Sequence, residues 1–273
     1  MDIVAEVLLG GAGVVAAGLA AFRLYGRRQV IKTYQEGRSL RLVGDYAQAE
    51  RMLSVASIGF PSARVLRFWL MLERGQVADA RVLLAEIPRT LAGQECATWL
   101  ALRHDRLTSA EQEVGRLMQL MEMSKDAPPW LSSSAIYTHA CLMIEEDSLN
   151  YATEKLSNSI QIARRAYGPE SIYAVPPAVA LSYLHFLKGN FEKSGKLLST
   201  GLVAYSKSLG ADHPRTARLR VMLGIVAAAA GVVTEPRADI QRAALTFKKY
   251  GLESSEDART VTRVLLWLDG FAR

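Results

Sequence analysis

The sequence contains only two cysteines among its 273 residues, Cys96 and Cys141, and no set of metal ligands surrounds either of them. This count excludes a disulfide framework and suggests no zinc site, so we interpret both residues as buried thiols. Long runs of charge are also missing. The 33 basic and 27 acidic residues give a net charge of +6, but no five like charges are consecutive. The surface is therefore mildly basic, and we expect no nucleic-acid partner.

Motifs that carry chemistry are missing as well. The four histidines fall in different segments and form neither an HExxH motif nor a close pair: His104, His139, His185 and His213. His139 and Cys141, two residues apart on a helix, point to different faces and cannot readily share a metal. No GxxxxGK[ST] phosphate loop occurs, and "GGAG" at Gly10 lies inside an apolar run without a preceding strand. We therefore expect no catalysis, no metal and no cofactor.

No segment shows the alternating pattern of a strand, which predicts an all-α fold. Half of the residues are apolar, enough for a sizeable core. A ten-residue pattern recurs instead: a Gly or Asp, an apolar third residue, a small sixth residue and an apolar tenth residue. Its copies start 31, 30, 42, 42 and 42 residues apart, at Gly44, Gly75, Asp105, Asp147, Gly189 and Gly231. Each copy predicts the corner of a helical hairpin.

At each corner the Gly or Asp ends one helix, and the small residue lets the next helix pack closely. The predicted small residues are Ala49, Ala80, Ala110, Ala152 and Ser194. The apolar tenth residues follow four positions later, on the same face of the helix. We expect them to be buried: Leu53, Leu84, Val114, Leu156, Leu198 and Ile240.

This organisation resembles the tetratricopeptide repeat (TPR) family from about Lys32 onward. The first copy fits best, with Gly37 inside the first helix, "GDY" at the corner and Pro61 after the second helix. The 42-residue units resemble the kinesin-light-chain subtype, whose "LGxxHP" loop appears here as "LGADHP" from Leu209 to Pro214. In this loop we expect Asp212 to cap the next helix and Pro214 to occupy its first turn.

The resemblance implies a right-handed solenoid of about six helical hairpins over residues 32–273, closed by a capping helix at about residues 255–268. Some positions depart from the pattern. Pro236 replaces the small residue of the last corner, and "EMSKDAPPW" at residues 122–130 predicts an extended loop. Pro176 and Pro177 predict either a kinked helix or a helix that starts late.

One long apolar run precedes the repeats. Residues 7–22 read "VLLGGAGVVAAGLAAF" without a charge, and residues 3–25 are long enough to span a bilayer because Glu6 and Arg23 can lie at its surfaces. Basic residues follow the run at Arg23, Arg27, Arg28 and Lys32. The positive-inside rule then predicts a single-pass anchor over residues 1–31, with the N-terminus outside and the repeats on the cytoplasmic side.

Three alternatives to an anchor remain: a cleaved signal peptide, a targeting presequence and a buried core helix. A signal peptide needs positive charge before its apolar run, whereas Asp2 and Glu6 precede this one. Small residues such as Gly10, Gly13 and Ala17 have the spacing that lets membrane helices pack closely. They predict self-association, and so a possible homo-oligomer, or packing against a partner's membrane helix.

In the TPR family the first helix of each hairpin lines the concave face. The resemblance therefore implies a partner-binding groove whose residues are Tyr34, Arg38, Arg41, Trp69, Trp99, Tyr137, Tyr183 and Phe186. The arginines would hold a carboxylate and the aromatic rings would hold apolar side chains. The alternative is that these rings are ordinary core between repeats. We interpret a second basic group, Arg215, Arg218 and Arg220, as a solvated face.

Together these features favour a non-enzymatic, membrane-anchored scaffold that binds or assembles protein partners. A second hypothesis is a structural subunit of a larger membrane complex, whose membrane helix packs permanently against partner helices. A third is an enzyme with a site hidden in the groove, although the nucleophile and ligand sets that it would need are missing.

Overall fold

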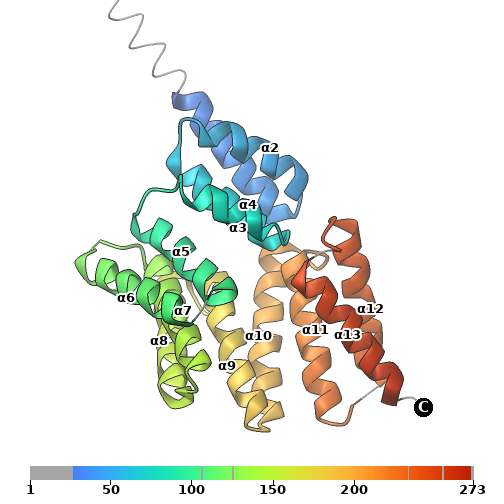
Figure 1. Cartoon of the computed structure of the whole chain (residues 1–273). Coiled ribbons are helices and arrows are strands. Elements are labelled where there is room, and N and C mark those ends of the chain that lie inside the picture. Colours follow the sequence, from blue (N-terminus) through green and yellow to red (C-terminus); the bar gives the residue numbers. More distant parts are fainter. Residues whose placement is uncertain (1–26, 106, 125, 233, 254, 272–273) are drawn as a thin grey trace, which may run out of the picture. The chain divides into compact units, whose positions relative to one another are not determined.

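The structure is a computed structural model that describes residues 27–105, 107–124, 126–232, 234–253 and 255–271 (Figure 1). Over these residues the chain is helical and contains no strand, as the missing alternation predicts. The chain divides into two compact units, residues 1–67 and 68–273, and the division falls inside helix α3. We expected the boundary between the anchor and the repeats to fall between residues 31 and 32. These two residues lie inside a helical segment that runs from residue 27 to residue 43.

The first unit contains that segment, α2 (Tyr46–Ser57) and the first half of α3 (Pro61–Glu73). Asp45 begins α2, because its side chain accepts a 3.1 Å hydrogen bond from the backbone N–H of Gln48. The two helices of this hairpin pack closely at Gly37, where a Cβ atom would lie only 2.9 Å from Leu53. A larger residue at position 37 would have to displace the side chain of Leu53 or the helix that carries it.

The second unit continues with five helical hairpins, the first of which begins with the end of α3. The remaining helices are α4 (Val77–Leu84), α5 (Leu91–His104), α6 (Leu107–Met123), α7 (Pro129–Glu145), α8 (Leu149–Tyr167), α9 (Val175–Leu187), α10 (Phe191–Leu209), α11 (Pro214–Ala229), α12 (Thr234–Lys249) and α13 (Glu256–Phe271). Figure 1 shows α9, α10 and α11 side by side, and α13 packs on α12 and α11. The predicted closing helix is thus present.

All six predicted corners lie between two helices. Four of them carry glycines with φ between 70° and 89°, and Asp147 adopts φ 58°. This left-handed conformation is the one that terminates helices and favours glycine. Asp105 differs, because it ends α5 in an extended conformation with φ −116° and ψ −175°. The corner pattern therefore predicts where the helices end but not a single way of ending them.

The predicted small residues are fully buried at the hairpin contacts, from Ala49 to Ser194. The tenth residues are also buried, with one exception in α4. There Leu84 is half-buried and its neighbour Leu83 is buried, so the prediction for Leu84 was wrong. The reason is the position in the helix: α4 ends at Leu84, whereas the other tenth residues lie inside longer helices.

The loop before α11 was predicted correctly at Pro214 and wrongly at Asp212. Pro214 occupies the first turn of α11, so the capping position is the residue directly before it. That residue is His213, whose Nδ1 accepts a 3.1 Å hydrogen bond from the backbone N–H of Arg215. The prolines at 176 and 177 lie at the start of α9, after a 3-10 turn at Ile172–Ala174, which confirms the late start rather than the kink.

The predicted membrane anchor at residues 7–22, with Gly10, Gly13 and Ala17, lies outside the described residues. Within the part of the chain that the structure describes, no helix combines the length and the apolar character needed to cross a bilayer.

Candidate partner-binding face

Three aromatic side chains from consecutive hairpins of the second unit form a row. Trp69 of α3 meets Trp99 of α5 edge-to-face, with ring centroids 6.2 Å apart, and Trp99 meets Tyr137 of α7 at 5.3 Å. All three residues are half-buried, so each keeps part of its surface in solvent. Each belongs to the first helix of its hairpin. We refer to this row as the aromatic ladder, and to the side of the first helices that carries it as the inner face.

One guanidinium group, from Arg103, contacts the ladder. Arg103, one turn after Trp99 on α5, is exposed and holds its guanidinium carbon 5.6 Å from the centre of the Trp99 ring. This is the geometry of a cation–π contact. Arg218 of α11 is half-buried, and its Nε lies 3.2 Å from Oδ1 of Asp257 on the closing helix.

Tyr137 and Cys141 stand one turn apart on α7. Burial raises the pKa of Tyr137 well above its usual range, while the charges of Arg218 and Arg103 act in the opposite direction. Burial also raises the pKa of Cys141 to about 12. Both groups are therefore neutral at physiological pH, and Cys141 has none of the thiolate character that a nucleophile needs.

Glu95 is a buried carboxyl group on the same helix as Trp99, one turn earlier. Its side chain is 4% exposed and accepts a hydrogen bond from the hydroxyl of Ser134 on α7. Burial raises its pKa to about 7, and the hydrogen bond from Ser134 opposes that rise only in part. The sequence offered no signal for this residue, because a single glutamate in a helix reveals neither its burial nor its partner.

An ion pair joins the first and last of these first helices. Nε of Arg215, at the start of α11, lies 3.1 Å from Oε1 of Glu73, the last residue of α3. Both residues are half-buried. The basic group that we interpreted as a solvated face is therefore mostly paired, since Arg215 contacts Glu73 and Arg218 contacts Asp257. That interpretation was wrong for these two residues because their partners come from distant helices.

The structure brings together only part of the predicted groove. Trp69, Trp99 and Tyr137 form the ladder, and Tyr183 of α9, 50% exposed, stands one 42-residue repeat after Cys141. Phe186 contacts Phe191 at 5.6 Å and packs against the core of α9, α10 and α11.

The remaining predicted groove residues belong to the first unit. Tyr34 packs edge-on against Phe60, with ring centroids 4.7 Å apart. Arg38 is exposed and Arg41 is half-buried.

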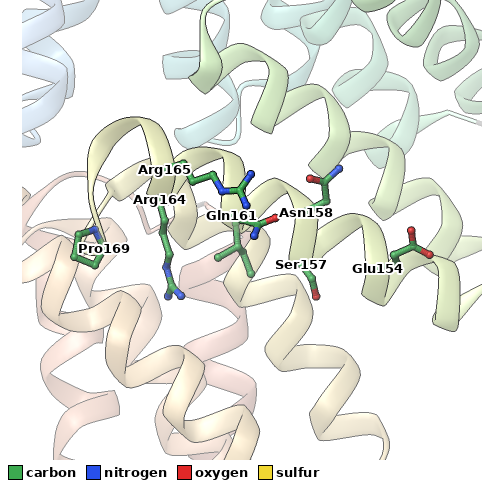
Figure 2. Close-up of a pocket in the computed structure, with 8 residues that line it drawn as sticks. Glu154, Ser157, Asn158, Gln161, Arg164, Arg165 and Pro169 are labelled. Carbon is green, nitrogen blue, oxygen red and sulfur yellow. The ribbon is translucent and has the colours of Figure 1, made fainter.

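A shallow depression lies along α8, outside the inner face (Figure 2). Its lining comes almost wholly from that helix: Glu154, Ser157, Asn158, Ile160, Gln161, Arg164, Arg165 and Pro169. Figure 2 shows these side chains spread along the helix rather than converging on one point. Within the described ranges, no three His, Cys, Asp or Glu side chains gather where they could hold a metal ion. Among these features, the ladder with Arg103 is the best candidate for a binding site.

No protein-family model matches the sequence, and no curated protein matches it significantly. Several solved structures share its fold. One is a signal transduction ATPase with numerous domains from Pyrococcus horikoshii, which has a tetratricopeptide repeat sensor. It is 17% identical with a TM-score of 0.53, and the match covers 75% of this chain and 32% of that one. The chain thus spans about a third of that ATPase.

A second similar structure is a Rap protein in complex with competence and sporulation factor, at 11% identity and a TM-score of 0.57. The match covers 87% of this chain and 74% of the Rap protein. A third is BtubC (BKLC) from P. vanneervenii, at 12% identity and a TM-score of 0.50, covering 78% of this chain and 92% of that one. These similarities, together with the hairpins, show an α-helical fold of the tetratricopeptide repeat type.

Proposed function

We propose that this protein is a membrane-anchored, non-catalytic scaffold that binds an extended segment of a protein partner along the inner face of its second unit. The observation that carries the proposal is the aromatic ladder with Arg103 beside it. Half-buried Trp and Tyr rings together with arginine are the residues that dominate binding energy at protein interfaces. The Rap protein of similar fold, determined with a bound factor, supports a binding role but does not identify a partner.

The anchor part of the proposal rests on the sequence. Residues 3–25 are long and apolar enough to span a bilayer, and basic residues follow them. Tethering at a membrane raises the local concentration of both partners, so a groove of modest affinity is sufficient there. The later repeats, with their 42-residue period and "LGADHP" loop, support the kinesin-light-chain subtype within this proposal.

Affinity capture in mild detergent tests the binding face. We expect Trp99→Ala to weaken partner binding about tenfold or more, because it removes the central ring of the ladder. The matched control is Trp130→Ala, since Trp130 is a partly exposed tryptophan in a different aromatic cluster with Tyr167 and Tyr173. Circular dichroism checks that both variants remain helical. Two outcomes would contradict binding at the inner face: the same loss of binding in both variants, or no loss of binding in either.

Two further arms of the capture experiment separate the parts of the chain. A chain beginning at Lys32 loses the partners that are held through the membrane helix and keeps those held by the repeats. Charge reversal of Arg38 and Arg41 to Glu tests the first unit, where the sequence places a carboxylate contact. Arg38 is exposed, and an exposed charge contributes only about 0–1 kcal/mol to folding, whereas Arg41 is half-buried, so the melting temperature must be measured to separate lost binding from unfolding.

The proposed topology has its own test. Protease added to intact cells or organelles should leave the repeats undigested, because the basic residues after the apolar run retain them on the cytoplasmic side. Permeabilised samples serve as the control and should be digested. Digestion before permeabilisation would indicate the opposite topology. A mature chain that starts after residue 22 would favour a cleaved signal peptide.

A structural subunit of a larger membrane complex is the second candidate, favoured by exposed apolar side chains on second helices. Val82 of α4 is 72% exposed, and Leu245 of α12 is 69% exposed. Val203 of α10 is exposed as well, and it occupies the position equivalent to Leu245 in the preceding 42-residue repeat. A subunit that buries these residues against a neighbour would aggregate when purified alone, whereas a scaffold that binds through its inner face would remain monodisperse.

A further inference from the structure

One ion pair of the second unit joins two hairpins that lie far apart in the sequence. Arg215, at the start of α11, donates hydrogen bonds from Nε and from a terminal nitrogen to the same carboxylate oxygen of Glu73, the last residue of α3. The Nε–Oε1 distance is 3.1 Å, and 142 residues separate the two partners. Their side chains are 34% and 22% exposed, so water reaches this pair only in part.

Packing elsewhere in the second unit follows the order of the chain. Consecutive helices contact each other, and the first helices of neighbouring hairpins also meet, as α5 meets α7 and α7 meets α9. Four interfaces between hairpins therefore lie between α3 and α11. In a solenoid the small rotations at successive interfaces add up to its curvature, so the distance between remote repeats changes easily. A contact across that distance fixes the curvature of the whole row.

The aromatic ladder lies on the row of helices that this contact closes. Trp69 stands one turn before Glu73 on α3. Trp99 and Tyr137 continue the ladder on α5 and α7. The row then runs through α9 to α11, where Arg215 meets Glu73. The spacing of the hairpins that carry the ladder therefore depends on the curvature that the ion pair fixes.

We propose that the ion pair between Glu73 and Arg215 is a clasp that holds the inner face closed, and that its release opens this face by uncoiling the second unit. An ion pair suits this role because its strength depends on charge alone. The apolar contacts between neighbouring hairpins persist when it breaks, so the unit can open without unfolding. The inference concerns the conformation of the second unit and goes beyond the proposed binding of a partner.

The distance between two spin labels tests the clasp on the full chain in mild detergent. The labels are attached through Ala78→Cys on α4 and Ala211→Cys in the loop before α11, because both alanines are exposed and each is close in sequence to one partner. The native cysteines should take up no label, since Cys96 is fully buried and burial raises the pKa of Cys141 to about 12. A chain without the added cysteines checks this.

Charge reversal at either partner should open the clasp. Glu73→Arg and Arg215→Glu each place two like charges at the contact, so the mean label distance should lengthen by more than the width of the wild-type distribution. A positive charge favours the end of α3 and a negative charge favours the start of α11, so both variants should keep their helicity by circular dichroism. The double variant restores opposite charges and should return the wild-type distance.

Glu170→Arg is the matched control. Glu170 pairs with Lys207 of α10, only 37 residues away, so its reversal changes the net charge equally without touching the contact between α3 and α11. The label distance should stay that of the wild type. Three outcomes would overturn the clasp: single reversals that keep the wild-type distance, a double variant that stays open, or an equal lengthening in Glu170→Arg. Because no partner is added, none of these outcomes depends on the proposed function.

Discussion

Glu95→Gln is expected to stabilise the second unit at pH 8 by about 3 kcal/mol and to leave its stability unchanged at pH 4. The pKa of Glu95 is raised by burial from an ordinary 4.5 to about 7, so folding opposes ionisation of this carboxyl group. The difference between these values corresponds to about 3 kcal/mol once the group is ionised in both states. A glutamine keeps an oxygen that can accept the hydrogen bond from Ser134, but it never acquires the charge.

The sign of this effect follows from proton binding. Between pH 4.5 and about 7 the folded chain retains a proton on Glu95 that the unfolded chain has lost. The stability that the neutral carboxyl provides is therefore complete below pH 4.5 and is lost as the pH rises through about 7. Melting temperatures of the two proteins should coincide at pH 4 and separate by several degrees at pH 8.

The matched control for this prediction is Glu111→Gln, because Glu111 is exposed on the neighbouring helix α6. It changes the net charge by the same amount without touching a buried group. We expect its melting temperature to follow that of the wild type at both pH values. If the wild type and Glu95→Gln melt together at pH 8, the carboxyl of Glu95 is not buried at the contact between α5 and α7.

The same substitution at two glycines should have opposite effects. At Gly93, in the first turn of α5, an added Cβ atom would lie 2.0 Å from the carbonyl oxygen of Pro88. This neighbour is backbone and cannot rotate away, so Gly93→Ala must displace the helix or the loop before it. We expect a loss of about 2–3 kcal/mol or more, the cost of overpacking a rigid contact.

Gly115 provides the control within the next helix. A Cβ atom there meets nothing within 4 Å, and Gly115 lies exposed in the middle of α6. Gly115→Ala should therefore stabilise the protein by up to about 1 kcal/mol, the difference in helix propensity. Thermal melts of both variants at one pH measure the contrast. Two changes of the same sign would contradict the close approach of Pro88 to α5.

Gly93 also matters for the inner face, because α5 carries both Glu95 and Trp99. The helix starts at a fixed place: the hydroxyl of Thr90 accepts a 3.3 Å hydrogen bond from the N–H of Gly93. The loop at Pro88 packs directly against this first turn. A displaced start moves the ladder residues on α5 with it, so Gly93→Ala should also weaken partner binding even where the protein still folds.

The hairpins were predictable because their signals are local. A glycine such as Gly44 or Gly189 ends a helix through its own backbone conformation. A small residue at the sixth position of the pattern, such as Ala49, indicates a close contact between two helices. Repetition of the same ten-residue pattern turned weak signals into a firm prediction of six corners. The errors, at Leu84 and at the cap of α11, arose where helix length or the exact first residue decided the outcome.

The candidate site was predictable only in its aromatic part. Trp69, Trp99 and Tyr137 could be placed on first helices from the repeat pattern, and the structure then set them in contact. The charges around them could not be assigned in this way. Glu73 meets Arg215 across 142 residues of sequence, and Asp257 reaches Arg218 from the closing helix.

The sequence by itself therefore determined the helices, their corners and the row of first helices, because backbone conformation and helix packing are governed by near neighbours. Only the tertiary structure decided which carboxylate faces which arginine and that Glu95 is buried beside Ser134. Ionisation and ion pairing depend on the distance in space between groups and on their exposure to water, and both arise only when helices far apart in the sequence pack together.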